Sequence, residues 1–285
     1  FVDLMQGRPL VRNSGRPGFL GPSYGPFRPD LSKIFARELE TGMKGELARL
    51  GNNHTTSLTL NPNLSLGRIH SRRQLLAGLD RIKRDVDASG MMEAMDRFTQ
   101  QAVGILTSGR FAEALDFSNE PTEVVARYQA PADKIERFVT SESPEGSMKL
   151  LLARRLIEAG VRVVSLTISD FDTHSKNFPR MRQMAPIIDQ GLTALVTDLD
   201  ERGMLDDVTI VAWGEFGRTP QINKNGGRDH WGQVMSVLVS GGGLKMGQVI
   251  GATNSRGEDP VRRVMNSNCL LSTVYNRFGI DADHA

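Results

Sequence analysis

Two apolar runs in the sequence are each followed at once by side chains that can bind a metal ion or an anion. After the run VRVVSLTIS and Asp170 comes FDTH, and the run VTIVAW is followed by GEFGRTP, with GRDHW further along the same loop. The candidate functional residues of these segments are Asp172, His174, Glu215, Arg218, Asp229 and His230. Imidazole nitrogens and carboxylate oxygens together suit Zn²⁺ or Mn²⁺. They suit Ca²⁺ or Mg²⁺ less well, because these ions prefer oxygen ligands alone.

The pattern assigns two roles to these side chains. The predicted ligands of a divalent metal ion are Asp172, His174, Glu215, Asp229 and His230. Arg218 is predicted to lie beside the metal as a free cation, where its planar guanidinium can bind a phosphate, sulfate or carboxylate group through two parallel hydrogen bonds. Arg218 is therefore the predicted catalytic residue.

The same residues also have ordinary structural explanations. Asp172 and His174 could belong to the cap of a following helix, because Asp, Ser and Thr are common at helix N-termini. Glu215 and Arg218 could form a surface ion pair, which stabilises a protein by ~0–1 kcal/mol. His230 could be a packed, hydrogen-bonded histidine. The spacing of these residues does not by itself decide between the structural and the metal-binding interpretation.

The hydrophobic pattern from residue 143 onwards predicts the elements that would position the two loops. SPEGSMKLLLARRLIEAG has the start and stop signals of a helix, and further helices are predicted at about 178–202 and 262–278. VRVVSLTIS, DVTIVAW and VMSVLVS are rich in β-branched residues and are predicted strands. This order predicts an α/β fold with a mainly parallel sheet flanked by helices. Because parallel strands end at one edge of a sheet, Asp172 and Glu215 are expected to meet there.

The rest of the chain is interpreted as part of one domain that covers residues 1–285. Residues 1–65 are rich in Gly, Pro and Asn, which predicts a turn-rich loop region. Residues 66–142 carry apolar side chains at helical spacing and are predicted to form a helical insert, with short helices at RFAEALDF and EPTEVVARYQ. Residues 143–285 then form the α/β core that carries the site.

Composition narrows the classes of partner. The net charge of +2, from 35 basic and 33 acidic residues, favours neither nucleic acid nor a membrane surface. No apolar stretch approaches the ~18 residues that a membrane-spanning helix needs. The one cysteine, Cys269, excludes an internal disulfide, and its apolar helical surroundings predict a buried thiol. Nothing in the sequence indicates the oligomeric state.

Several segments resemble the bacterial family known as domain of unknown function 1501. They are LLLARRLIEAGVRVVSL, FDTHSKNF, GEFGRTPQINKNGGRDHW and SVLVSGGGLKMGQVIGAT, with GFLGPSYGPF, LSLGRIHSRRQLLAGLD and LDFSNEP further upstream. That family resembles the alkaline phosphatase and sulfatase superfamily in fold. By this resemblance, Asp172 and His174 match the superfamily's ligand loop, and His230 matches its late ligand histidine. Glu215 occupies the place where many relatives carry an Asp-His pair after a strand.

The resemblance implies a metal-dependent hydrolase that acts on a small-molecule or glycan ester of phosphate or sulfate, exported to the periplasm. It also implies that a metal-binding Asp and a Ser, Thr or Cys nucleophile belong to a segment upstream of Phe1, so that the α/β domain is expected to be incomplete. The alternative is a non-catalytic scaffold of the same fold. Such a scaffold would bind a sulfated or phosphorylated glycan, or a protein partner, without turnover, because a fold does not specify a function.

Overall fold

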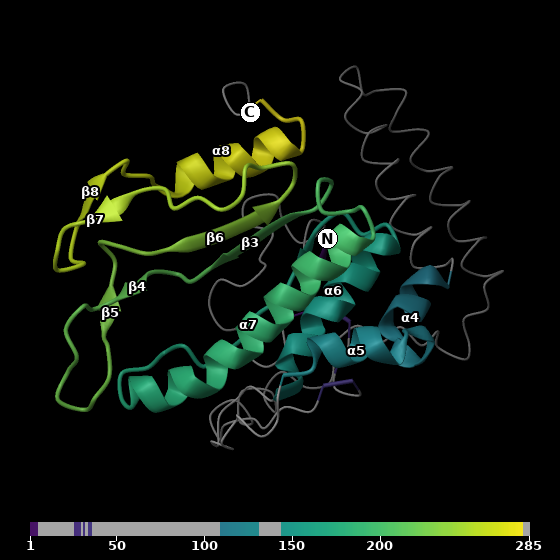
Figure 1. Ribbon diagram of the computed structural model, residues 1–285, viewed down its shortest axis with the longest axis horizontal. Helices are drawn as coiled ribbons and strands as arrows, with labels where there is room; N and C mark the ends of the chain where they lie inside the picture. Colours follow the sequence, from purple (N-terminus) through teal and green to yellow (C-terminus); the bar gives the residue numbers. More distant parts are fainter. Residues whose placement is uncertain (5–25, 30, 32–33, 36–108, 131–143, 282–285) are drawn as a thin grey trace, which may run out of the picture. The chain divides into compact units, whose positions relative to one another are not determined.

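The structure is a computed structural model. It describes residues 1–4, 26–29, 31, 34–35, 109–130 and 144–281. The predicted turn-rich region and most of the predicted helical insert lie outside these residues. The described elements combine helices with short strand pairs (Figure 1), so the predicted mixture of helices and strands is confirmed. None of the described helices has both the length and the apolar character that crossing a membrane requires.

The chain divides into two compact units. The first unit consists of Phe1–Pro121 and Leu151–Thr167, and the second consists of Thr122–Leu150 and Ile168–Ala285. The helix predicted from SPEGSMKLLLARRLIEAG forms as a short 3-10 helix, η6 (Pro144–Ser147), followed by α6 (Met148–Glu158). The boundary between the two units falls within α6.

In the first unit, the predicted strand VRVVSLTIS is much shorter than expected. Only β2 (Val164–Ser165) forms, and it pairs in parallel with β1 (Val2–Asp3). The carboxylate of Asp3 is buried and accepts hydrogen bonds from Arg28 Nε at 2.8 Å and from Ser165 Oγ at 2.9 Å. These side-chain contacts stabilise the pair of β1 and β2, because strands of two residues form few backbone hydrogen bonds with each other.

A buried ionic cluster joins the helices of the first unit. These are α4 (Arg110–Leu115), the 3-10 helix η4 (Phe117–Asn119) and the part of α6 in this unit. The Glu120 carboxylate is 4% exposed and accepts hydrogen bonds from both Arg154 and Arg155. Arg155 Nε also donates to the carbonyl oxygen of Ala114 at 2.9 Å. Because a buried charge needs partners of opposite sign, this cluster specifies how α6 packs against the end of α4.

In the second unit, α5 (Thr122–Tyr128) and the long helix α7 (Asn177–Glu201) pack together around apolar side chains. The core cluster consists of Ala130, Met184 and Ile187, with Ile168 and Met181 packed against it. The bounds of α7 agree closely with the helix predicted at about 178–202, because its apolar stripe has the period of a helix.

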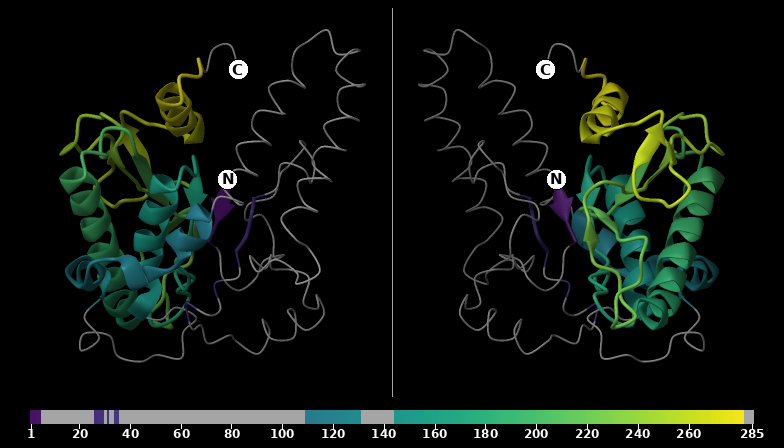
Figure 2. Two further views of the ribbon diagram at one scale, coloured as in Figure 1. Left: turned by 90° about the vertical axis from the view of Figure 1, so that its right-hand side faces the viewer. Right: turned by 90° about the vertical axis from the view of Figure 1, so that its left-hand side faces the viewer.

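The strands of the second unit form three antiparallel pairs. β3 (Thr209–Trp213) pairs with β6 (Val237–Gly241), and β4 (Gly217–Arg218) pairs with β5 (His230–Trp231). β7 (Ala252–Thr253) pairs with β8 (Pro260–Arg262), and the unit ends in α8 (Ser267–Arg277). The right-hand view of Figure 2 faces the side of the second unit where β4, β5, β7 and β8 lie. The Nε1 atom of Trp231 in β5 donates to the Glu258 carbonyl at 2.8 Å.

The predicted mainly parallel sheet is not found among the described residues, where three of the four strand pairs are antiparallel. The connection from β3 to β6 explains the difference. A parallel crossover needs a dozen or more residues and usually a helix. Residues 214–236 instead form β4, β5 and turns, so β6 returns beside β3 in the opposite direction. In the described residues, β2 and β3 belong to different strand pairs, so the expected single sheet edge for Asp172 and Glu215 is not shown.

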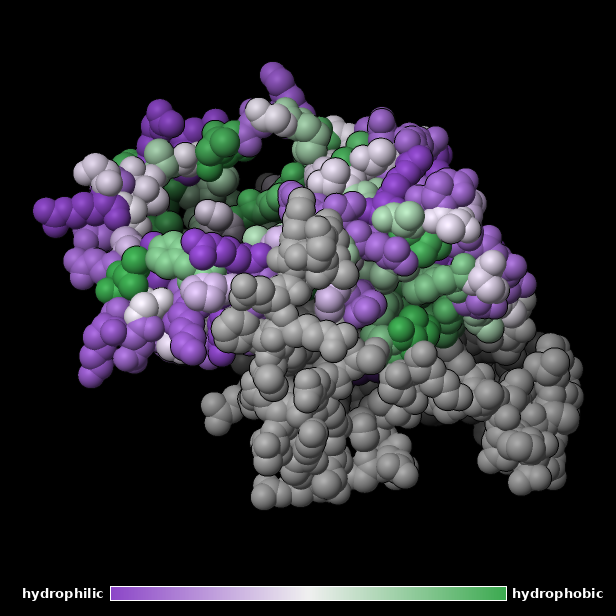
Figure 3. Space-filling view, turned by 60° about the horizontal axis from the view of Figure 1, so that its bottom comes forward, coloured by the Kyte–Doolittle hydropathy of each residue, from purple (hydrophilic) through white to green (hydrophobic). Residues whose placement is uncertain are grey.

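The predicted burial of Cys269 is wrong, because this residue is exposed. None of the residues of α8 is buried, although the sequence of α8 is apolar in part. Arg277 NH1 donates to the Gly242 carbonyl at 2.8 Å and joins the C-terminal end of α8 to the turn after β6. On the face that Figure 3 presents, hydrophobic residues reach the surface between hydrophilic ones. Exposed apolar side chains of the second unit include Trp213, Val249 and Val261.

One buried hydrogen bond is expected to stabilise the packing of α5 on α7. Tyr128 is fully buried, and its hydroxyl donates to Asp198 Oδ2 at 3.0 Å. Tyr128→Phe should lower the free energy of unfolding by about 1–3 kcal/mol, because a buried carboxylate oxygen loses a donor. Urea unfolding followed by circular dichroism measures this change. Tyr275→Phe, on the exposed helix α8, is the matched control, and an equal effect of the two substitutions would contradict this assignment.

Candidate metal site

The candidate site lies in the second unit, where two loops meet. The α7 loop (residues 170–176) precedes helix α7, and the hairpin loop (residues 219–229) connects β4 to β5. Two backbone hydrogen bonds join these loops, from Arg228 N to Thr173 O at 2.9 Å and from Lys176 N to Asn225 O at 3.2 Å. A third joins the first residue of α7 to the hairpin loop, from Asn177 N to Gly226 O at 2.9 Å. Main-chain contacts therefore bring the motifs FDTH and GRDHW together.

A glycine permits this close approach. A Cβ atom built on Gly227 would lie 2.1 Å from both the carbonyl carbon and the carbonyl oxygen of His174, and 2.4 Å from the nitrogen of Ser175. These atoms belong to the backbone and cannot move aside as the end of a long side chain would. The absence of a side chain at Gly227 therefore sets how closely the hairpin loop packs on the α7 loop.

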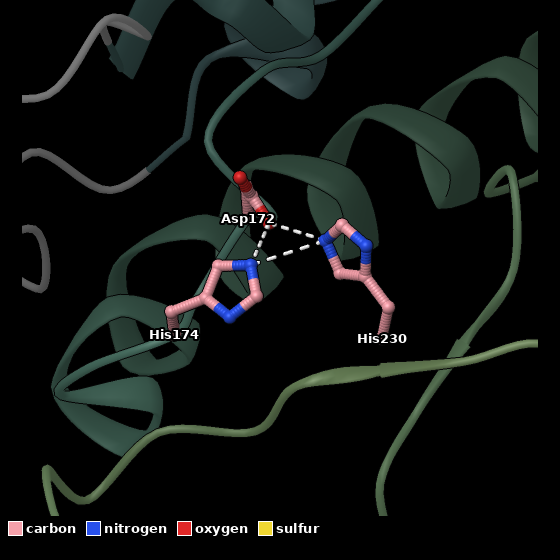
Figure 4. A group of neighbouring side chains, drawn as sticks. All are labelled: Asp172, His174 and His230. Carbon is pink, nitrogen blue, oxygen red and sulfur yellow. Dashed lines mark hydrogen bonds and ion pairs between the residues drawn. The ribbon is translucent and has the colours of Figure 1, made fainter.

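Three side chains from the two segments point toward one another (Figure 4). Asp172 Oδ1 lies 3.0 Å from His174 Nε2 and 3.1 Å from His230 Nε2. The two Nε2 atoms are 3.1 Å apart. The three atoms thus form a nearly equilateral triangle made of one carboxylate oxygen and two imidazole nitrogens, with His230 supplied by β5 and the other two by the α7 loop.

The hydrogen bond behind His174 favours a tautomer in which the triangle suits a cation. Asp229 Oδ1 lies 2.7 Å from His174 Nδ1. An ionised carboxylate can only accept hydrogen bonds, so the neutral tautomer of His174 that donates to Asp229 carries its proton on Nδ1 and presents a lone pair at Nε2. That lone pair faces the carboxylate oxygen of Asp172. In this tautomer a cation bound between the two atoms would contact both.

The separations of the three atoms fit a small divalent ion. At a metal–nitrogen distance of about 2.0–2.1 Å, neighbouring tetrahedral ligands lie about 3.3 Å apart and neighbouring octahedral ligands about 2.9 Å apart. The observed 3.0–3.1 Å lies between these values. Ca²⁺ binds its ligands at about 2.3–2.6 Å and holds them further apart. The donor set and the spacing therefore fit Zn²⁺ or Mn²⁺ better than Ca²⁺.

Arg218 is not the free cation that the sequence predicted. Its NH2 group donates to Asp172 Oδ1 at 2.7 Å, and its NH1 group donates to the Arg228 carbonyl at 3.2 Å. Partial burial raises the pKa of the Asp172 carboxyl. Hydrogen bonds from Arg218 and His230, with the nearby charges of His174 and Arg218, outweigh that effect and lower the pKa to about 2. Asp172 is therefore ionised throughout the neutral pH range.

Asp229 lies behind His174 and outside the triangle. Hydrogen bonds from His174 and from Asn223 lower the pKa of Asp229, so this carboxylate is also charged. A carboxylate that accepts the distal N–H of a histidine orients the ring and makes its other nitrogen a better ligand. The geometry therefore gives Asp229, which the sequence placed among the metal ligands, the position of a residue that orients a ligand.

Glu215 is not brought into the triangle. It lies exposed on the bend between β3 and β4, and the group of converging ligand atoms in the described residues consists of Asp172, His174 and His230. Two further residues contact the site and were not predicted. The ring of Phe216 lies 4.3 Å from that of His230, centroid to centroid. The other is Asn223, which directly precedes the sequence KNGG. That sequence predicts a turn, but a turn signal does not indicate that Asn223 contacts a candidate ligand.

The triangle is open to solvent. The side chains of Asp172, His174 and His230 are 69%, 48% and 51% exposed. A site with three protein ligands and an open side leaves coordination positions for water or a substrate, whereas structural zinc sites are closed by four protein ligands. The candidate site therefore differs from a closed structural zinc site, because one side of the triangle is open.

Comparison with known proteins provides a family but no activity. The chain matches the family described as "Protein of unknown function (DUF1501)" over residues 3–285. No curated protein and no solved structure matches the chain. The family description assigns no activity.

The docking of the two loops is expected to depend on Gly227. Gly227→Ala should lower the free energy of unfolding by about 1–3 kcal/mol, because the added methyl group overlaps the backbone of the α7 loop. Thermal or urea unfolding measures the loss. Gly232→Ala is the matched control, since a Cβ there meets nothing within 4 Å, and its effect should stay within about 0.5 kcal/mol. Equal stabilities of the two variants would show that the loops are not packed in this way.

Proposed function

The chain belongs to the DUF1501 family, and we propose that it is a metal-dependent hydrolase of phosphate or sulfate esters. The observation that carries this proposal is the triangle of Asp172 Oδ1, His174 Nε2 and His230 Nε2 at 3.0–3.1 Å, with Asp229 hydrogen-bonded behind His174. The resemblance of this family to the alkaline phosphatase and sulfatase superfamily supplies the reaction class. That placement is part of the proposal.

Asp172, His174 and His230 would hold the metal ion. A bound divalent ion acts as a Lewis acid that polarises the ester group and neutralises charge as it develops. Asp229 keeps the proton of His174 on Nδ1, so that Nε2 stays available as a ligand. Phe216 packs beside the ring of His230 and restricts its orientation.

Arg218 is the residue that the proposal places on the anionic group of the substrate. Its guanidinium carries five N–H donors, and the contacts with Asp172 and with the Arg228 carbonyl use two of them. The remaining donors can bind oxygens of a phosphate or sulfate group that approaches the open side of the triangle. A preorganised charge in this position stabilises the transition state more than the ground state.

Glu215 provides a control for the ligand assignment. It is an exposed carboxylate two residues beyond β3, close in sequence to the site but outside the triangle. Asp172→Asn, His174→Ala and His230→Ala should each abolish stoichiometric Zn²⁺ or Mn²⁺ binding by the full-length protein, because each removes a converging donor atom. Glu215→Gln should retain the metal. Metal analysis after dialysis measures occupancy, and retention of metal by the three ligand variants would overturn the proposed site.

Arg218 should behave differently from the ligands. Arg218→Ala should keep the metal, because loss of a neighbouring positive charge does not repel a cation. It should lower the turnover of p-nitrophenyl phosphate or p-nitrophenyl sulfate by ~10²-fold or more, as the loss of one preorganised charge stabiliser does. Arg218→Lys should restore little, since an ammonium group lacks the planar fork. Metal binding without hydrolysis of either ester by the wild-type protein would instead favour the non-catalytic scaffold that binds a sulfated or phosphorylated ligand.

A further inference from the structure

Asn223 contacts the backbone of His174 and the carboxylate of Asp229, which orients the His174 ring. Its Nδ2 atom donates to the backbone carbonyl of His174 at 3.0 Å and to Asp229 Oδ1 at 3.1 Å. That Oδ1 atom is the one that accepts the hydrogen bond from His174 Nδ1. One amide group therefore links the backbone of a proposed metal ligand to the carboxylate that orients its side chain.

The other end of the same amide shapes the hairpin loop. Asn223 Oδ1 accepts hydrogen bonds from the backbone nitrogens of Asn225 at 2.9 Å and Gly227 at 3.0 Å. These bonds close the turn that carries Gly227 against the α7 loop. The amide thus has two separable functions, because its oxygen builds the turn and its nitrogen contacts the site.

Asp229 needs such a partner. Its side chain is 51% exposed, so water competes for its oxygens. Within the described part of the chain, its carboxylate receives hydrogen bonds from His174 and from Asn223, while its backbone is held by Thr219, whose hydroxyl oxygen accepts from Asp229 N at 3.1 Å. A half-exposed carboxylate held by one histidine alone is free to turn toward solvent, and the second donor restricts that rotation.

We infer that Asn223 is a positioning residue of the metal site. Its Nδ2 group holds the carboxylate of Asp229 on Nδ1 of His174, and in this way aims the Nε2 lone pair of His174 at the triangle. The inference rests on the proposed metal-binding function. It extends the proposed site to a residue that contacts none of the three donor atoms. Asn223 holds Asp229, and Asp229 orients the single ligand His174.

The decisive variant separates the two functions of the amide. Asn223→Asp keeps the acceptor oxygen that closes the turn and removes the donor toward Asp229 and the His174 carbonyl. Asn225→Asp is the matched control. It adds the same charge to the same loop, at an exposed residue that contributes only its backbone to the hydrogen bonds of the described residues.

Zn²⁺ and Mn²⁺ affinities of the full-length proteins are measured by competition with a chelator. Asn223→Asp should bind either ion ~10-fold or more weakly than wild type, the usual effect of losing a residue that orients a ligand, whereas Asn225→Asp should stay within ~2-fold. The added negative charge by itself would raise the affinity for a cation. A lower metal affinity of Asn223→Asp therefore cannot result from the charge. Asn223→Ser, which is uncharged and carries a hydroxyl oxygen that can accept from the turn nitrogens, should show the same loss and serves if Asn223→Asp fails to fold by circular dichroism.

A second measurement does not need a metal. The tautomer of His174 in the metal-free protein is read from imidazole ¹⁵N shifts at about pH 8, above the usual histidine pKa of about 6.5, with His174→Gln to assign the signals. Wild type and Asn225→Asp should show the Nδ1–H form, and Asn223→Asp should shift His174 toward the Nε2–H form. A purely structural role would lower stability and leave the tautomer unchanged.

The two readouts distinguish the two hypotheses. Equal metal affinities and equal tautomers in Asn223→Asp and Asn225→Asp would overturn the inference and leave the proposed function intact. If wild type binds neither ion, the proposed function fails. In that case a shifted tautomer in Asn223→Asp still establishes that Asn223 orients His174, and an unchanged tautomer overturns this as well.

Discussion

The close contact between the hairpin loop and the α7 loop is the constraint on which the site depends. The ligand triangle takes Asp172 and His174 from one segment and His230 from the other. The backbone hydrogen bonds between the loops bring these segments together, and the missing side chain at Gly227 permits the approach. Backbone contacts hold the two loops at a fixed separation because they do not depend on long, flexible side chains. The positions of the donor atoms therefore follow from the packing of the main chain.

Electrostatics then determines what this contact can hold. Two ionised carboxylates, Asp172 and Asp229, lie on opposite sides of His174. Asp229 lies against Nδ1 and Asp172 faces Nε2, so both nitrogens of the ring are next to a negative charge. Arg218 already places one positive charge on Asp172, from the side of β4. A position that suits a cation thus lies beside a guanidinium that suits an anion, and the proposed metal-dependent reaction on a phosphate or sulfate ester would use both.

Local sequence patterns predicted the helices well and the sheet poorly. The apolar stripe of α7 repeats with the helical period, and its bounds of Asn177–Glu201 agree with the prediction to within a residue or so. Strand direction depends on the path of the connection between two strands. The apolar runs of β3 and β6 look alike whether the strands pair in parallel or antiparallel, and the helix-free connection between them gave the antiparallel pair. Cys269 was predicted to be buried because the sequence of α8 is apolar in part, but this residue is exposed.

For the site, the sequence by itself determined the chemical types of the ligands and the two motifs that supply them, because imidazole and carboxylate groups next to strand ends are visible in the residue order. Only the tertiary structure decided which of them converge. It placed Asp229 behind His174, left Glu215 outside the triangle and put Asn223 in contact with both Asp229 and the His174 carbonyl. Those outcomes depend on distances of a few ångströms between loops distant in sequence. Such distances follow from how the backbones of the loops pack, and residue spacing does not encode them.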